Sequence, residues 1–273
     1  MSRIATGLGL ILVGGFVLIK GGLPLALFLV VVGCLAFYEV QQMTELKSWG
    51  LMALNMVAYT ACILFVLWLN VWVTFVIIGG AFVIFITEFK RKALVFRSNL
   101  YLNNLKFFLY ITLGFWSVFY IRSMDEQFFV TTGLVFMFVA IWATDVFAYY
   151  GGKLFGKHPL SPISPKKTIE GTVIGIAAAM VFSSLSLYII AILPYSNEVQ
   201  MNFFVIPALV AGLIGAIAQF GDLYESLIKR TYKVKDSSNL LPGHGGILDR
   251  ADSTLFVAPI MAVFLEILMG ILP

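Results

Sequence analysis

The stretch FFVIPALVAGLIGAIAQFGDLYESLI, residues 203–228, is apolar over most of its length and becomes polar only toward its end. A helix needs about 20 predominantly apolar residues to cross the hydrocarbon core of a bilayer. The whole chain is 60% hydrophobic and 12% charged, unlike a soluble domain. Its apolar runs are 4–19, 23–40, 51–69, 71–88, 103–121, 128–150, 170–193, 203–228 and 253–272. They predict an all-α polytopic membrane protein with about nine transmembrane helices.

The positions of the basic residues predict the orientation of these spans. If the N-terminus lies in the cytoplasm, all but two of the 18 lysines and arginines fall on or beside the cytoplasmic side. The two exceptions are Lys20 and Arg122. Because cytoplasmic loops carry an excess of Lys and Arg, we expect a cytoplasmic N-terminus and a C-terminus outside.

The polar residues divide the chain into two regions. Residues 1–106 hold transmembrane helices and a basic cytoplasmic loop at 89–106, and acids such as Glu39 lie near the ends of their spans. From Trp142 onward, polar residues gather at helix ends and in two long cytoplasmic loops. We therefore expect residues 107–273 to form a C-terminal transmembrane catalytic region.

Acids lie within predicted spans of the second region at Asp145, Asp222 and Glu225, and at Glu266, to which we assign no role. A carboxylate at such depth is costly and usually faces a partner or a water-filled cavity. Asp222, Ser226 and Lys229 are spaced i, i+4, i+7 and therefore share one helix face, and Glu225 is also placed to contact Lys229. The alternative is an internal ion pair that only holds helices together.

The stretch KDSSNLLPGHGGILDRADS, residues 235–253, joins the Asp222 span to the last span. Its glycines, Gly243, Gly245 and Gly246, allow positive φ angles and a close approach of the backbone to a ligand. His244 lies between two of them, and we favour a phosphate contact over a metal for its side chain.

Two aspartates mark the entry to the last span. An ordinary role as the N-cap of this helix would explain either Asp252 or Ser253. Asp249 has no such explanation, and Arg250 beside it is a natural fork for phosphate oxygens.

The stretch SPISPKKTIEG, residues 161–171, precedes another span. Ser164 followed by Pro165 predicts an N-cap and first helical residue. Lys166 and Lys167 would add two positive charges at this helix N-terminus, an arrangement that suits phosphate. An ordinary capped helix with cytoplasmic lysines explains the same residues. Together, the acids and bases predict a cytoplasm-facing polar pocket suited to Mg²⁺ and phosphates.

The run SLIKRTYKVKDSSNLLPGHGGILDRAD, residues 226–252, resembles the signature of the phosphatidate cytidylyltransferase family. TDVFAYYGGKLFGKHPLSPISPKKTIEG, residues 144–171, is similar to a second recurring segment of that family. Ala251 departs slightly, since a larger aliphatic residue or threonine is expected there. The positions that match in type and spacing are Ser226, Lys229, Arg230, Lys235, Asp236, Pro242, His244, Gly245, Gly246, Asp249, Arg250 and Asp252.

This resemblance implies a Mg²⁺-dependent reaction of CTP with phosphatidate, which gives CDP-diacylglycerol and pyrophosphate. It implies one or two Mg²⁺ ions held by Asp222 and Asp249, with Asp145 as a further carboxylate. The catalytic residues it implies are Asp222, Asp249, Lys229, Arg250 and Asp145. The substrate-binding residues it implies are Ser226, Arg230, Lys235, His244, Gly245, Gly246, Lys166 and Lys167.

The implied partners are CTP, phosphatidate in the bilayer, membrane lipids and a second copy of the chain, and no nucleic acid is expected. The implied location is the bacterial cytoplasmic membrane, with the active site facing the cytoplasm. A cytidylyltransferase for another lipid phosphate, such as an archaeal ether lipid, fits the same motifs. A lipid kinase and a transporter with buried acids are further alternatives. The acids gather at cytoplasmic ends of the second half, whereas a transporter predicts acids near the midplane of both halves.

Overall fold

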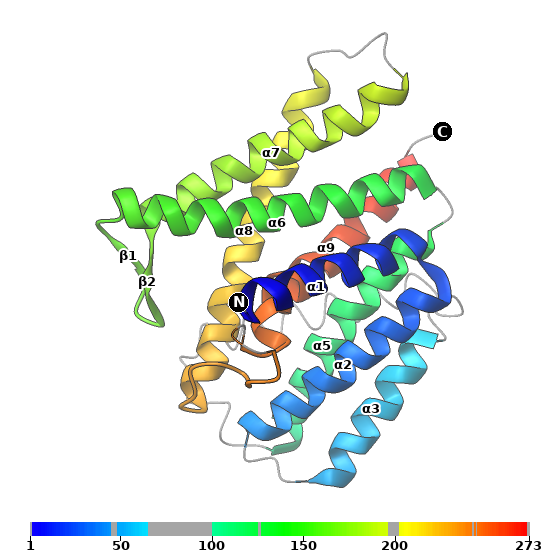
Figure 1. Cartoon of the computed structure of the whole chain (residues 1–273), viewed down its shortest axis with the longest axis vertical. Coiled ribbons are helices and arrows are strands. Elements are labelled where there is room, and N and C mark those ends of the chain that lie inside the picture. Colours follow the sequence, from blue (N-terminus) through cyan, green and yellow to red (C-terminus); the bar gives the residue numbers. More distant parts are fainter. Residues whose placement is uncertain are drawn as a thin grey trace. The chain divides into compact units, whose positions relative to one another are not determined.

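The computed structural model describes residues 2–44, 48–64, 100–124, 127–195, 202–241, 243 and 245–271. The chain forms two compact units (Figure 1). Unit 1 comprises Met1–Asp125 together with Leu227–Pro273, and unit 2 comprises Glu126–Ser226. The predicted division at residue 106 stays a prediction.

Unit 1 is a bundle of apolar helices. In a bilayer, helices satisfy their own backbone hydrogen bonds, so long apolar runs take this form. Helix α2 packs against α1, α3 and α5, and α5 also packs against α3 and α9. The helices are α1 (Ser2–Lys20), α2 (Gly22–Met43), α3 (Trp49–Leu64), α5 (Leu100–Ser123), α9 (Leu248–Ile271) and the last turn of α8 (Asn202–Thr231).

A close approach between α2 and α3 anchors this bundle. The ring of Tyr59 lies against Gly33, where any side chain would overlap it. The Tyr59 side chain is fully buried, and its hydroxyl donates a hydrogen bond of 2.6 Å to the carbonyl of Leu29. Phe37 meets the same ring edge-on, with centroids 5.6 Å apart. Small residues at helix contacts permit this packing in membrane proteins, so α2 has a fixed position in unit 1.

Unit 2 contains α6 (Gln127–Phe155), strands β1 (Pro159–Ser161) and β2 (Ser164–Thr168), α7 (Ile169–Tyr195) and most of α8. Helices α6 and α7 pack closely along their lengths. A side chain at Gly175 would lie 2.6 Å from the Thr144 carbonyl oxygen, so glycine is needed there. The two strands form an antiparallel hairpin that connects α6 to α7 (Figure 1).

The hairpin corrects one prediction from the sequence. Ser164 and Pro165 do not open a helix, because Ser164 pairs with Ser161 across the hairpin. Proline is compatible with an edge strand, where its missing N–H costs no ladder hydrogen bond. Helix α7 begins at Ile169, and the hydroxyl of Thr168 accepts a hydrogen bond of 3.1 Å from the Gly171 amide. Thr168 is therefore the N-cap.

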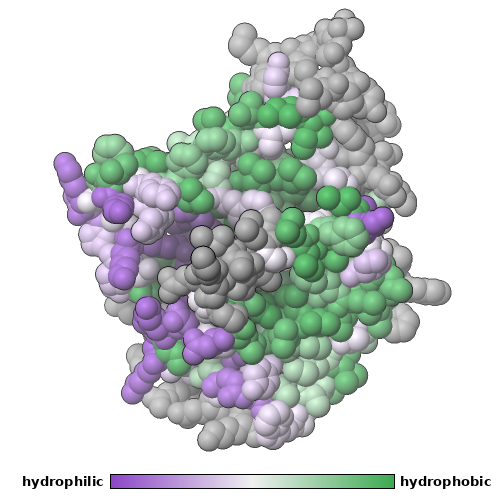
Figure 2. All heavy atoms as spheres, in the orientation of Figure 1, coloured by the Kyte–Doolittle hydropathy of each residue, from purple (hydrophilic) through white to green (hydrophobic). Residues whose placement is uncertain are grey.

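Every predicted span within the described residues lies on a helix, and six helices are long and apolar enough to cross a membrane. Span 71–88 lies outside the described residues, and 51–69 is described to residue 64. Hydrophobic side chains cover the helices of each unit, whereas hydrophilic ones gather over the hairpin (Figure 2). The protein is therefore helical and polytopic, while the count of nine and the orientation stay predictions.

Candidate active site

The loop that connects α8 to α9, residues 232–247, is organised around Asp249. The carboxylate of Asp249 forms an ion pair of 2.6 Å with Lys229 Nζ, and these side chains are only 9% and 12% exposed. Its Oδ2 atom accepts hydrogen bonds from the amide and hydroxyl of Ser237, at 2.9 and 3.0 Å, and from the Gly246 amide at 2.8 Å. Lys229 and Gly246, both predicted site residues, thus contact Asp249 directly.

Glu39, from the middle of the N-terminal region, contacts the same loop. Its side chain is fully buried in α2. Oε1 accepts hydrogen bonds of 2.7 Å from the Ser238 hydroxyl and 2.7 Å from the Ile247 amide. Oε2 accepts hydrogen bonds of 3.0 Å from the Ser237 hydroxyl and 3.0 Å from the Leu248 amide. These amides begin α9, so Glu39 satisfies backbone donors that a helix start leaves unpaired.

This arrangement corrects the predicted start of the last helix. Helix α9 begins at Leu248, so Asp252 and Ser253 lie inside it and neither is its N-cap. The helix starts earlier because carboxylates accept from the first backbone amides, Glu39 from a neighbouring helix and Asp249 from within the first turn. Negative charge at a helix N-terminus is also favoured by the helix dipole.

The glycines of this loop approach the protein's own carboxylates. Gly245 has a φ of +80°, and a side chain there would lie 2.7 Å from Asp249 Oδ2. A side chain at Gly246 would overlap the Ser237 hydroxyl and lie 2.6 Å from Glu39 Oε1. Both positions therefore require glycine for the packing of the loop itself. Their predicted contact with a substrate stays a prediction.

In unit 2, Asp222 is the centre of a second polar cluster. Its Oδ2 atom forms an ion pair of 2.6 Å with Lys167 Nζ, and the side chains are 29% and 19% exposed. Lys167 also donates to Gln219 Oε1 at 3.3 Å, and the Ser226 hydroxyl donates to Asp222 Oδ1 at 3.4 Å. The sequence predicted that Asp222 and Ser226, four residues apart on α8, share one face. The ion pair with Lys167 of the hairpin was not predicted.

The hairpin is held to the start of α7 by Glu170. Its Oε2 atom accepts hydrogen bonds from the amides of Lys157 and His158, at 3.1 and 3.2 Å. Its Oε1 atom lies 2.6 Å from His158 Nδ1. Successive side chains of a strand point to opposite faces, and Lys166 is accordingly exposed while Lys167 turns to Asp222.

Other predicted site residues lie on exposed surface. Within unit 1, the side chains of Arg230, Lys235 and Arg250 are exposed, and Arg230 Nη1 donates to the Val234 carbonyl at 3.1 Å. Within unit 2, Asp145 is exposed on α6. His244 lies outside the described residues.

The donor atoms differ in how well they suit Mg²⁺. Among the described residues, no three His, Cys, Asp or Glu side chains group into a ready metal cage. Mg²⁺ is usually held by one or two carboxylates with water and substrate phosphates, so such a cage is not required. Asp222 is partly exposed and fits this role. To bind Mg²⁺, Asp249 would have to give up its ion pair with Lys229, because its oxygens already accept several hydrogen bonds.

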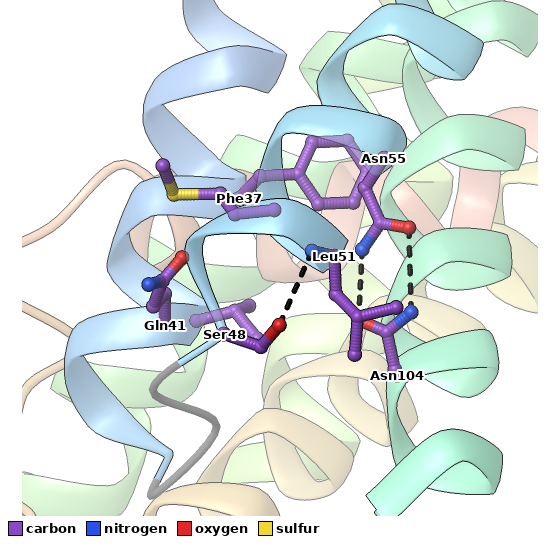
Figure 3. A pocket seen from close by; sticks show the side chains of 8 residues that line it. Phe37, Gln41, Ser48, Leu51, Asn55 and Asn104 are labelled. Atoms are coloured by element: carbon purple, nitrogen blue, oxygen red, sulfur yellow. Dashed lines mark hydrogen bonds between the residues drawn. The ribbon is translucent and has the colours of Figure 1, made fainter.

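A small pocket of unit 1 lies among α2, α3 and α5 and has no charged residue in its lining. Figure 3 shows Asn55 and Asn104 facing each other, joined by amide hydrogen bonds of 2.8 and 3.3 Å. Ser48 accepts from the Leu51 amide beside them. Since a triphosphate needs cationic partners, this pocket is not the phosphate site. Its lining residues are Phe37, Val40, Gln41, Ser48, Leu51, Met52, Asn55 and Asn104.

Sequence reasoning missed the partners that come from distant elements. Glu39 was the strongest available signal, because a carboxylate within a transmembrane span is costly and rarely without a partner. Gln219 also gave a weaker signal, as a polar residue one turn before Asp222. Ser237 and Ser238 gave none, since serines in a loop are common.

The chain belongs to the cytidylyltransferase family, whose model matches residues 1–268. A phosphatidate cytidylyltransferase of Bacillus subtilis (strain 168) is 34% identical over 279 residues, covering 97% of this chain and 97% of the relative. One of Staphylococcus aureus (strain COL) is 31% identical over 91% of this chain and 92% of the relative. One of Helicobacter pylori (strain ATCC 700392 / 26695) is 42% identical over 55% of this chain and 52% of the relative.

Proposed function

We propose that this protein transfers the cytidylyl group of CTP to phosphatidate, giving CDP-diacylglycerol and pyrophosphate. The family match over residues 1–268 carries this proposal, and the relatives that align over nearly the whole chain bear the name of this activity. The polar clusters agree with it, because each pairs a carboxylate with a lysine at the end of an apolar helix.

The reaction needs charge stabilisation more than a strong base. A phosphate oxygen of phosphatidate attacks the α-phosphorus of CTP, and the bond to the oxygen that bridges to the β-phosphorus breaks. The second pKa of a phosphate monoester is about 6, so the attacking group is largely anionic at neutral pH. The main barrier is repulsion between two polyanions, which fixed cations in the site reduce.

Lys229 and Arg250 are the proposed cationic contacts in unit 1. Lys229 is held by Asp249 in a mostly buried setting, so its ammonium group is fixed in position. Arg250 is an exposed residue directly after Asp249, and the planar fork of a guanidinium suits two phosphate oxygens. Arg230, in the last turn of α8, and Lys235, in the α8–α9 loop, add exposed positive charge. In unit 2, Lys166 and Lys167 of the hairpin supply the corresponding charges.

Mg²⁺ is proposed as the cofactor, with Asp222 as a ligand because its carboxylate is partly exposed beside a serine hydroxyl. When bound, Mg²⁺ would neutralise charge on the nucleotide phosphates. If Asp222 held the ion and released Lys167, that lysine would be available for phosphate oxygens. Asp249 remains a predicted ligand, and it would have to release Lys229 to bind the ion.

The setting follows from the sequence and the relatives. We propose that the protein lies in the cytoplasmic membrane of a bacterium, with these clusters facing the cytoplasm, because basic residues concentrate on that side. The lipid phosphate would then wait at the interface while CTP arrives from the cytosol. Assembly as a homodimer is part of the proposal through the family resemblance.

The test is pyrophosphate release by the purified protein in detergent. Phosphatidate is supplied with CTP, ATP, GTP or UTP in turn, each with and without Mg²⁺. The proposal predicts release only with phosphatidate, CTP and Mg²⁺ together. Release with another nucleotide would contradict the assignment of CTP, and undiminished release in a chelator would contradict the role of Mg²⁺. A folded protein that releases none would favour the transporter or lipid kinase alternatives.

A further inference from the structure

Glu39 holds the loop between the helix ends that carry Lys229 and Asp249, although it belongs to α2 in the N-terminal region. Its two contacts with backbone amides, one at each side-chain oxygen, require those oxygens to accept, and two serine hydroxyls donate to the same oxygens. A carboxylate accepts at both oxygens, whereas a carboxamide accepts at only one. The environment of Glu39 is therefore built for a carboxylate.

The contacts of Glu39 reach Asp249 through one side chain. The Ser237 hydroxyl lies 3.0 Å from Glu39 Oε2 and 3.0 Å from Asp249 Oδ2. A hydroxyl has one proton, so it donates to one of these carboxylates at a time. The Ser237 amide donates to Asp249 in addition. Any shift of Ser237 therefore changes the position of Asp249 and its pairing with Lys229.

The loop has little room to compensate. Gly246 lies against both Glu39 and Ser237, and even one methyl group there would overlap the hydroxyl. Glu39 also accepts from the first amides of α9, the helix that carries Asp249 in its first turn. One carboxylate thus fixes both the loop and the helix start.

We propose that Glu39 is a positioning residue for cytidylyl transfer, which sets the geometry of Asp249 and Lys229 without contacting substrate. This rests on the proposed function. The expected signature is a fall in kcat with little change in KM for CTP, because exposed bases such as Arg250 still bind phosphate. Loss of an outer hydrogen-bonding partner of a site typically lowers activity about 10- to 100-fold.

The test compares Glu39→Gln with Glu39→Asp and with a matched control, all in the full chain in detergent. Glu39→Gln should lower kcat by about 10-fold or more, and Glu39→Asp, which keeps both oxygens, should recover part of it. Glu266→Gln is the control, because this acid lies on α9 and accepts from the Tyr120 hydroxyl at 3.1 Å, without a contact to the loop. The control should keep kcat within about twofold of the parent.

A double-mutant cycle separates positioning from a general structural effect. If Glu39 acts through Ser237, then Ser237→Ala combined with Glu39→Gln should lose much less activity than the product of the single losses. Ser238→Ala removes a hydroxyl that donates to Glu39 Oε1 and accepts from the Leu240 amide at 3.1 Å, and it should lower kcat by about threefold. This variant also serves if Glu39→Gln does not fold, and a kcat equal to the parent's would then overturn the proposal.

The outcomes distinguish this inference from the proposed function. If the parent releases no pyrophosphate from CTP and phosphatidate, the proposed function fails. If the parent is active and folded Glu39→Gln matches its kcat, the positioning role is refuted. Multiplicative losses in the cycle, with no recovery in Glu39→Asp, would also refute it.

Discussion

Replacing Gly246 with alanine tests the geometry of the α8–α9 loop with one methyl group. The added carbon would overlap the Ser237 hydroxyl and lie 2.6 and 2.7 Å from the two Glu39 oxygens. Neither side chain has free space to move into, since Glu39 is fully buried and Ser237 is 5% exposed. The loop must therefore move, and the hydrogen bonds around Glu39 and Asp249 must lengthen.

The cost follows from these contacts. Overpacking of a filled site costs about 1–3 kcal/mol. Each hydrogen bond to a charged group contributes about 1.5–3 kcal/mol, and we expect about one to be lost. Gly246→Ala should thus lower the free energy of unfolding by about 2.5–6 kcal/mol. A displacement of about 1 Å at Asp249 should lower kcat about 100-fold.

The assay pairs thermal unfolding in detergent with pyrophosphate release. Gly50→Ala is the matched control, because nothing lies within 4 Å of a side chain at this exposed position of α3. Alanine is favoured over glycine in a helix by about 1 kcal/mol, so this variant should unfold at the same or a higher temperature with unchanged activity. If Gly246→Ala behaved like Gly50→Ala, the close packing of the loop around Glu39 would be refuted.

Three further substitutions test individual residues. Asp249→Asn should nearly abolish turnover in protein that still elutes as a folded species, because Lys229 loses its charged partner; near-normal kcat would remove Asp249 from the site. Asp222→Asn should raise the Mg²⁺ concentration for half-maximal activity or abolish activity, and an unchanged Mg²⁺ titration would contradict its role as a ligand. Lys20→Ala should leave kcat and KM unchanged, since this lysine ends α1 and is predicted outside the cytoplasmic face; a large loss would contradict the predicted orientation.

The helices could be predicted from the sequence because their signal is local. A run such as 203–228 is long and apolar, and in a bilayer such a run forms a helix because its backbone must satisfy its own hydrogen bonds. The hairpin at 159–168 could not be predicted in the same way. Ser164 and Pro165 carry the signature of a helix start, but pairing with Ser161 prevailed over that local preference.

The contacts of the candidate site were predicted only within short distances along the chain. Asp222 and Ser226 are four residues apart on α8, and their hydrogen bond follows from the helical repeat. Helical spacing predicted Asp222 and Glu225 as neighbours of Lys229, whereas its ion pair with Asp249 depends on how the loop folds. Glu39 is separated from Ser237 by 198 residues, so spacing carried no information about their contact.

The most direct test of the proposed activity follows labelled phosphorus from CTP into lipid. The purified protein is incubated with phosphatidate and Mg²⁺, with CTP labelled at either the α- or the γ-phosphorus, and the lipid is extracted into organic solvent. The account predicts that the α label enters the lipid as CDP-diacylglycerol, while the γ label stays in the aqueous phase as pyrophosphate. Transfer of the γ label to the lipid, or of neither label, would contradict it.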